Sequence, residues 1–513
     1  MNKQTGHPRT RTQTWHCWQR GLRSTARYKN PYADVTIKVT FEGPEHRRIK
    51  AFGFWDGGRT FRIRCAFPAP GDWTWRTTCS NPKDTGLHDR RGTVTVSTAR
   101  TKNPLYKHGF LKVSKNGRYL THADNTPFFW LGDTPWSGPF KSTDKEWARY
   151  LKNRAAKGVS VIQVAMVRTW LGNKDADGNV AFTKPDASQW NPAFWRRFER
   201  KVQAANERGL AVFIVGVMDP INRDKKKDPP HPKAARLFAR NLAARLFGHH
   251  VIFSPAFDDG HEQLPIMRAT GKALRAATKE HLISNHFGTC PVEHNLHAEP
   301  WLGFNMFQSG HNAWRRERQL EFVTARAREM PLYLRALPGP KPCVNGEAIY
   351  EGESSRNTRH GNARTVRHTA YLSLLSGACG YTFGVQSIWR WKPDWATWLN
   401  RDASRHMALL GKLFRQFEWW RLRPAHRLIR NQPKQHERKM VLARGNRADF
   451  AIAYLPDNPK IALDTRAFRG PLAARWVNPR DGSSHALRRR IPNRATQRLA
   501  RPATGDWVLI LET

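Results

Sequence analysis

Near the N-terminus, apolar and polar residues alternate in short runs, a pattern typical of half-buried β-strands. The alternation extends from about residue 35 to residue 96 and includes the runs VTIKVTF, TFRIRCAF, DWTWRTT and TVTVS. Pro68, Pro70 and Gly71 form a turn between the second and third of these runs, so we expect the two runs to pair as a hairpin. The pattern predicts an antiparallel β-sandwich over residues 31–100, preceded by a basic N-terminal segment over residues 1–30.

Between about residues 127 and 422, apolar strand candidates alternate with helical periodicity. The predicted strands end at Asp133, Met166, Val217, Asp258, Gly288, His311, Glu347 and Trp389. Eight strands alternating with helices predict a (β/α)8 TIM barrel, within a domain that spans residues 101–423 with its lead-in. A doubly wound open sheet is the alternative. It would normally begin with a glycine-rich phosphate-binding turn, and none follows the first strand.

Two helix starts in this region carry clear capping signals. Thr143 and Glu146 have the spacing of a capping box before an apolar helical stripe. Asn191 and Pro192 supply an N-cap and a first-turn proline for a second helix, and Gly209 supplies its stop. These residues satisfy or remove the backbone donors that a helix end leaves unpaired, so they predict where the helices begin and end.

After Pro424 the strand pattern returns in the runs KMVLARG, DFAIAYL, AARWVNP and DWVLIL. These runs predict a second β-sandwich over residues 424–513. The fold class is therefore multidomain α/β plus all-β, with a TIM barrel between an N-terminal and a C-terminal β-sandwich.

Composition agrees with a folded protein of several domains. The chain has 513 residues, of which 39% are hydrophobic and 11% aromatic, and this excludes a disordered protein. The longest apolar run, residues 209–218, has half of the roughly 20 residues that a membrane span needs, so it is interpreted as a buried strand. No apolar segment follows the basic N-terminus, so we expect a cytoplasmic protein unless a signal has been removed.

The charge of the chain raises a different possibility. It has 87 Lys and Arg against 41 Asp and Glu, a formal net charge of +46, and a basic surface attracts phosphate. A nucleic-acid-associated protein is therefore one alternative. Basic residues are spread along the chain, however, and no RNP motif, zinc-finger spacing or basic zipper is present. We favour a solvated cationic surface suited to an acidic environment or an acidic polymer, with no specific nucleic-acid partner.

Cysteine and histidine spacing indicates no metal site. The six cysteines are scattered without a CxxC pair, and the expected hairpin would place Cys65 opposite Trp75, out of register with Cys79. We therefore predict free thiols. The pair His294 and His297 has no carboxylate or cysteine partner at ligand spacing, so we expect no metal there.

Several runs together resemble a known family. They are TPFFWLGDTPWSGPF (126–140), RAAKGVSVIQVAM (154–166), WLGFNMFQSGH (301–311), KPCVNGEAIYEG (341–352) and AYLSLLSGACGYTFGVQSIW (370–389). The chain resembles the apiosidase-like glycoside hydrolase family in these runs. Residues 53–75 resemble the β-sandwich commonly found before this barrel. Residues 476–482 and 506–511 resemble the small following domain that is often labelled collagen-binding.

The resemblance implies an enzyme that hydrolyses glycosidic bonds without a cofactor or a metal. The best-described members of the family remove apiose from a branch of an acidic pectin. In related barrel hydrolases the paired carboxylates end strands four and seven. Here those positions fall on Asp258 or its neighbour Asp259, and on Glu347. The family usually has a Gly-Gly-Asp-like ending after a Trp-containing strand four, whereas this chain has the run FSPAFD (253–258).

The chemistry explains why two carboxyl groups are needed. A glycosidic oxygen leaves only when it is protonated, so one group acts as an acid while the other, ionised, attacks or stabilises the anomeric carbon. We assign Glu347 as nucleophile and Asp258 as acid/base. As in related barrels with a covalent intermediate, we expect their carboxyl groups to be about 5–5.5 Å apart, which implies retention of anomeric configuration.

Other residues at the predicted strand ends are candidates for substrate binding. Asp133, His286, Gln308 and His311 could hydrogen-bond sugar hydroxyls. Trp136, Trp170 and Trp389 could stack on a sugar face, because an aromatic ring offers apolar area to its C–H groups. The bulky loops 219–232 and 289–302 are expected to close a pocket, which favours attack at a chain end.

The sequence therefore predicts a retaining, exo-acting glycoside hydrolase that cleaves an apiose-like or other furanoside or pyranoside from a polysaccharide side chain. The alternative is a non-catalytic carbohydrate-binding barrel, because the surroundings of Asp258 are altered. The polysaccharide or oligosaccharide partner could be acidic, given the basic charge of the chain.

Overall fold

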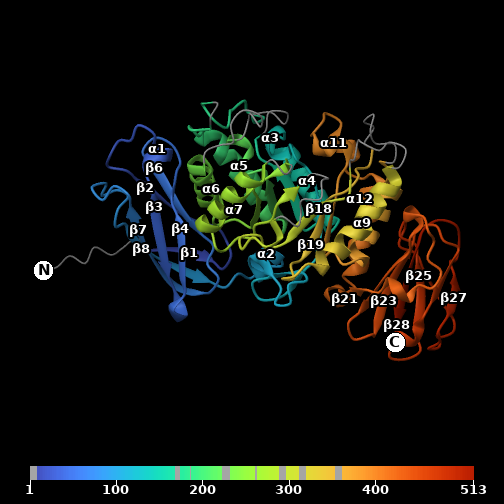
Figure 1. The fold of residues 1–513 in the computed structure, drawn as a ribbon. Coiled ribbons are helices and arrows are strands. Elements are labelled where there is room, and N and C mark those ends of the chain that lie inside the picture. Colours follow the sequence, from blue (N-terminus) through green and yellow to red (C-terminus); the bar gives the residue numbers. More distant parts are fainter. Residues whose placement is uncertain are drawn as a thin grey trace.

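The structure is a computed structural model that describes residues 9–167, 174–184, 187–221, 232–259, 263–287, 296–310, 319–352 and 361–513. A β-rich region lies at each end of the molecule, and a region of parallel strands and helices lies between them (Figure 1). In this described part of the chain, no helix is both long and apolar enough to cross a membrane.

The N-terminal region consists of two sheets around one apolar core. The larger sheet contains, in spatial order, β1 (Arg9–Gln13), β8 (Arg91–Ser97), β7 (Gly71–Cys79), β3 (Ile37–Glu42) and β4 (Arg48–Phe52). The smaller contains β2 (Trp18–Arg23), β6 (Thr60–Cys65) and β5 (Phe54–Trp55). Strands β1 and β2 lie within the segment 1–30, so part of the segment that we expected to precede the sandwich belongs to its sheets.

The expected hairpin between residues 60 and 79 is wrong, although both of its strands exist. Strand β6 pairs with β2 and β5, whereas β7 pairs with β3 and β8, so Cys65 faces Trp18 rather than Trp75. Pro68 and Pro70 remove two backbone donors, and the ladder cannot continue into a tight turn. The turn carries the chain from one sheet to the other.

The described cysteines are free thiols, as the sequence predicts. They are Cys17, Cys65, Cys79, Cys343 and Cys379. Cys290 lies outside the described residues.

A short lead-in joins the sandwich to the central region. It contains α2 (Pro104–His108) and a three-stranded sheet of β9 (Leu111–Val113), β10 (Leu120–His122) and β11 (Pro127–Phe128).

The central region is built on a seven-stranded parallel sheet. Its spatial order is β15 (Val251–Ser254), β14 (Ala211–Val215), β13 (Val161–Ala165), β12 (Trp130–Asp133), β20 (Gly380–Phe383), β19 (Cys343–Glu347) and β18 (Asn305–Gln308). The first strand therefore lies between the second and the last, as in a barrel and unlike a doubly wound sheet. The sheet is a TIM-like half-barrel.

Two further strands lie near the open edge of this sheet. Strands β16 (Phe257–Asp259) and β17 (His286–Phe287) form a separate parallel pair. A parallel bridge joins Phe253 of β15 to Ile283, and the backbone N–H of Gly303 donates to the carbonyl of Ile283 at 2.8 Å. These contacts place the β17 segment between β15 and β18, where strand five of a barrel would lie.

Helices surround the parallel strands. They are α4 (Asp144–Ala156), α5 (Pro192–Asn206), α6 (Pro232–Leu246), α7 (Leu264–Ala277), α9 (Gln319–Ala336), α10 (Ala363–Leu375) and α12 (Asp402–Phe414), with the shorter α3 (Gly138–Lys141) after β12. Thr143 and Glu146 form the predicted capping box, and the side chain of Asn191 caps α5 at Ala193 N, 3.1 Å away. Both predicted helix starts are confirmed.

One predicted strand end lies in a helix instead. Trp389 is the last residue of α11 (Gln386–Trp389), after β20 has ended at Phe383. The apolar run continues from the strand into this helix, so hydrophobicity alone does not reveal where the strand stops.

The C-terminal region is again two sheets around a core of its own. The larger sheet orders β21 (Leu422–Pro424), β22 (Val441–Gly445), β23 (Phe450–Leu455), β28 (Trp507–Glu512), β25 (Ala473–Val477) and β26 (Ser484–Ala486). The smaller pairs β24 (Lys460–Leu463) with β27 (Gln497–Ala500).

A buried ion pair connects this domain to the central region. Arg367 of α10 donates from Nε and Nη2 to the two carboxylate oxygens of Asp506, at 2.7 and 2.8 Å. The Tyr454 hydroxyl donates to Asp506 as well, at 2.9 Å. A bidentate ion pair fixes the relative orientation of its two side chains as well as their separation. It therefore holds the C-terminal domain and the central region in one arrangement.

Candidate active site

Four polar side chains converge at the carboxyl ends of neighbouring parallel strands. Asp258 lies on β16, His286 begins β17, Gln308 ends β18 and Glu347 ends β19. The Gln308 amide donates to Asp258 Oδ1 at 2.5 Å. His286 lies between the two carboxylates, with Nδ1 3.4 Å from Asp258 Oδ1 and Nε2 3.3 Å from Glu347 Oε2. One oxygen of each carboxylate and one imidazole nitrogen lie within 4.8 Å of one another.

Two β-bulges direct the carboxylates toward each other. In the β16–β17 pair the register shifts between Phe257 and Asp259, so Asp258 is the extra residue. Its φ of 58° lies in the left-handed region, which Asp tolerates better than most residues. In the β18–β19 pair the register shifts at Gln308, so that Gln308 pairs with Glu347. Both bulges lie where a strand enters the cluster, so the backbone itself sets the direction of each acid.

The two carboxylates have different surroundings. The side chain of Glu347 is 7% exposed, whereas that of Asp258 is 42% exposed. The Tyr350 hydroxyl donates to Glu347 Oε1, and Trp136 Nε1 donates to the Tyr350 oxygen at 2.9 Å. Burial and the adjacent Glu347 charge raise the pKa of Tyr350 well above its ordinary value, so the phenol remains a donor. Glu347 is thus fixed in direction, while Asp258 can exchange protons with solvent.

The hydrogen bonds indicate the tautomer of His286. The Gln308 amide nitrogen, which can only donate, lies 3.3 Å from His286 Nδ1. If Nδ1 accepts from this amide, the proton of a neutral imidazole is on Nε2, facing Glu347. The ring of His286 is 0% exposed. His286 is thus completely buried between the two carboxylates, and this burial does not favour the direct contact with sugar hydroxyls that the sequence suggests.

The position of Trp136 does not fit its expected role of stacking on a sugar face. It is 1% exposed, and its ring packs against Phe257 at 4.5 Å and edge-on to His286 at 5.3 Å between centroids. A ring covered in this way forms part of the wall and orients Tyr350 rather than stacking on a sugar.

Asp133 is not part of the cluster. Its carboxylate is completely buried, and Oδ2 accepts from Arg154 Nε at 2.5 Å and from the Tyr150 hydroxyl at 2.7 Å. Both partners belong to α4, so Asp133 faces the helix layer. The structure gives Asp133 a place in the packing of β12 on α4 and corrects the expected contact with sugar.

Trp389 lies beside the cluster and remains partly exposed. Its ring centroid is 6.3 Å from that of Tyr350, and the Arg390 guanidinium lies 4.3 Å from the Trp389 centroid. The predicted role of Trp389 in stacking on a sugar is compatible with this partial exposure and stays a prediction.

Several predicted residues lie outside the described part of the chain. They are Trp170, His294 and His311, the side chain of Asp259, most of the loop 219–232 and half of the loop 289–302. His297 is described and buried, and its Nε2 lies 2.9 Å from the Pro338 carbonyl.

Sequence reasoning missed Tyr350. The signal is present in the run CVNGEAIY, where a tyrosine follows Glu347 by three residues. Only the fold shows that the chain turns back after β19 and brings this hydroxyl to the carboxylate.

The arrangement has the chemistry of glycosidic bond cleavage. One carboxylate is buried and oriented by a phenol, and the other is accessible to solvent nearby. The same three side chains, Asp258, His286 and Glu347, also have ligand atoms close enough to hold a cation. The expectation that the chemistry needs no metal stays a prediction.

Comparisons with known proteins agree with this chemistry. Residues 114–421 match the family "Apiosidase-like, catalytic domain", residues 11–80 match a domain of unknown function, DUF5060, and residues 424–512 match the "Putative collagen-binding domain of a collagenase". No curated protein matches the chain.

Solved structures similar to this one include glycoside hydrolases. One, described as "Glycoside hydrolase", has a TM-score of 0.71 and 24% identity, over 80% of this chain and 98% of its own. A glycoside hydrolase family 5 protein from Bacteroides vulgatus has a TM-score of 0.71 and 23% identity, over 80% and 95%. These likenesses concern the fold. The family match, in contrast, covers more than half of the chain. The chain therefore belongs to the apiosidase-like family of glycoside hydrolases.

Proposed function

We propose that this protein is a retaining glycoside hydrolase, with Glu347 as nucleophile and Asp258 as acid/base. The proximity of the two carboxylates carries the proposal, because one oxygen of each lies within 4.8 Å of the other. Inverting enzymes hold their carboxyl groups roughly 6.5–9.5 Å apart to admit a water molecule. This proximity of one oxygen from each carboxylate supports direct attack by Glu347 on the anomeric carbon.

The reaction has two steps. In the first, Asp258 gives its proton to the glycosidic oxygen, that C–O bond breaks, and Glu347 forms an ester with the anomeric carbon. In the second, Asp258 takes a proton from water, the hydroxide oxygen bonds to the same carbon, and Glu347 leaves as a carboxylate. Tyr350 holds Glu347 in line for both steps, and the exposure of Asp258 allows it to change protonation state between them.

We also propose that the enzyme removes a terminal apiose-like or other furanoside or pyranoside from a polysaccharide side chain. Family membership supports this substrate class. Trp389 could stack on the sugar next to the cluster, since its ring is partly exposed beside Tyr350.

Two measurements test the proposal. Incubation with a panel of pectins, arabinans and bacterial glycans should release a monosaccharide from a chain end. Proton NMR of the first product should then show the anomeric configuration of the substrate. An inverted first product would reassign Glu347 as a general base acting on water.

A non-catalytic carbohydrate-binding barrel is the second candidate, because strand four carries the unusual run FSPAFD (253–258). Turnover of any aryl glycoside, lost in Glu347→Gln, excludes it. Binding of a glycan with no turnover across the panel would favour it.

A further inference from the structure

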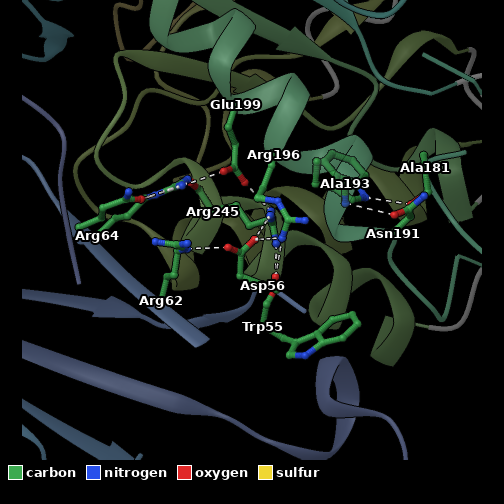
Figure 2. A network of polar contacts seen from close by, with 12 residues as sticks. Trp55, Asp56, Arg62, Arg64, Ala181, Asn191, Ala193, Arg196, Glu199 and Arg245 are labelled. Carbon is green, nitrogen blue, oxygen red and sulfur yellow. Dashed lines mark hydrogen bonds and ion pairs between the residues drawn. The ribbon is translucent and has the colours of Figure 1, made fainter. Parts of the chain in front are cut away.

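A charged cavity lies at the junction of the N-terminal sandwich and the central region, where Figure 2 shows arginines of β6, α5 and α6 around two acids. The cavity has a volume of about 330 Å³. Its lining includes Arg62 and Arg64 of β6, Arg196 and Arg200 of α5, and the amides Gln19 and Gln203. None of these residues belongs to the cluster around Glu347.

Arginine is in excess at this cavity. Asp56 is shared by Arg62 at 2.5 Å, Arg245 at 3.0 Å and Arg196 at 3.6 Å. Glu199 is shared by Arg64 at 2.7 Å and Arg245 at 2.5 Å. Two carboxylates therefore lie among four guanidinium groups, and Arg200 adds a fifth at the lining. Like charges gathered in one place favour an anion that neutralises them.

The arginines differ in how free they are to bind such an anion. Arg64 and Arg245 are nearly completely buried and engaged with Glu199. The side chains of Arg62 and Arg196 are 31% and 45% exposed. Arg200 is exposed and forms no hydrogen bond or ion pair among the described residues. Arg62, Arg196 and Arg200 thus offer donors to a ligand. The buried ion pairs of Arg64 and Arg245 with Glu199 hold the adjoining side chains in place.

The size of the cavity indicates a ligand larger than a simple ion. At about 30 Å³ per water molecule, its volume corresponds to roughly ten waters, and it falls within the range of small-molecule sites. A neighbouring cavity of about 260 Å³ shares Cys17, Gln203 and His249 with it. That second cavity is lined by His16 and Tyr106, whose rings stack at 4.0 Å.

We propose that these two cavities form a binding site for an anionic saccharide, distinct from the active site. Arg62, Arg196 and Arg200 would hold the acidic group, in the planar geometry that guanidinium offers to a carboxylate. The Gln19 and Gln203 amides would bind hydroxyls, and the His16–Tyr106 pair would contact the C–H groups of a neighbouring sugar ring. The site would hold an acidic polysaccharide at the N-terminal domain, whichever bond the active site cleaves.

Calorimetric titration of the full chain tests this site, with trigalacturonate, neutral galactotriose and inorganic phosphate as probes. We expect trigalacturonate to bind at least tenfold more tightly than either other probe, with an affinity that falls as salt is added. Arg196→Gln/Arg200→Gln should weaken trigalacturonate binding at least tenfold. The control Arg488→Gln/Arg489→Gln removes the same charge from the C-terminal domain and should change the affinity less than twofold.

Arg200→Gln alone keeps the test decisive if the double variant does not fold, because Arg200 forms no hydrogen bond or ion pair among the described residues. It should weaken binding at least threefold and leave aryl glycoside turnover and the melting temperature unchanged. Equal binding of phosphate and trigalacturonate would overturn the saccharide as ligand. An equal loss of trigalacturonate affinity in Arg196→Gln/Arg200→Gln and in the control Arg488→Gln/Arg489→Gln would show that the overall charge attracts the ligand. That result would overturn the proposed site.

Discussion

Asp133 and Glu347 occupy equivalent places in the parallel sheet and have opposite roles in the structure. Each is the last residue of a strand, β12 or β19, and each is buried. Asp133 pairs with Arg154 of α4, a full positive charge on the helix side of the sheet. Glu347 instead meets a neutral phenol and an imidazole on the side of the cluster.

The difference teaches that two acids at equivalent strand ends can have partners of very different charge. The buried carboxylate of Asp133 has a permanent cation beside it, which compensates its charge and holds it in place. A buried carboxylate held by neutral donors is oriented without being neutralised. Asp133 and Glu347 therefore differ in the charge of their partners and not in their position at a strand end.

Replacing Glu347 should have the largest effect on activity. Glu347→Gln keeps the shape of the side chain but cannot form the glycosyl ester, so we expect kcat/KM to fall by about 10³-fold or more. The melting temperature should stay within a few degrees of the native value. Glu418→Gln, an exposed Glu-to-Gln change away from the cluster, serves as the control. Near-native turnover by Glu347→Gln would exclude Glu347 as the nucleophile.

Replacing Asp133 should lower the stability of the protein and leave its activity nearly unchanged. Asp133→Leu leaves the Arg154 guanidinium buried without its partner, so we expect the free energy of unfolding to fall by about 3–5 kcal/mol in urea denaturation. The kcat/KM of the folded fraction should change less than about threefold. Asp133→Leu/Arg154→Met should recover much of the lost stability. A specific loss of kcat in a stable Asp133 variant would instead return this residue to the active site.

Asp258→Ala should discriminate between substrates. General acid help matters most when the departing oxygen needs a proton, so we expect a loss of about 10²-fold on substrates with poor leaving groups. Activated aryl glycosides should lose much less. Asp259→Ala is the matched neighbour and should show neither effect. If Asp259→Ala rather than Asp258→Ala shows the dependence on leaving group, Asp259 is the acid/base and Asp258 is not.

Tyr350→Phe should have the smallest effect on activity among the three changes within the cluster. Losing one hydrogen bond to a charged group should lower kcat about tenfold. Because the pKa of Tyr350 is well above its ordinary value, the phenol is protonated throughout the neutral range, and the factor should be the same from pH 6 to pH 9. Rates measured across that range check this. A loss that vanished as the pH rose would mean that the hydroxyl ionises in this range.

Local sequence signals predicted much of the architecture. The capping residues Thr143 and Asn191 gave correct helix starts, since capping depends only on neighbours in the chain. The strand ending at Glu347 was predicted at its true last residue. These features depend on short-range chemistry that a single sequence displays.

The direction of side chains at strand ends could not be predicted in the same way. A strand buried on both faces has no polar alternation to show which residues face the helices, so Asp133 and Glu347 look alike. The bulge at Asp258 depends on pairing with a strand almost thirty residues later. Such features arise from contacts between distant segments, which periodicity does not encode.

The Arg367–Asp506 pair has a consequence for how the protein is made. A ribosome synthesises Arg367 139 residues before Asp506. Until Asp506 emerges, α10 carries a guanidinium at a surface that the finished protein buries, and a charge without its partner is costly to desolvate. The ion pair between α10 and the C-terminal domain can therefore form only after Asp506 has been synthesised. Chains truncated before Asp506 should be preferred clients of chaperones during biosynthesis.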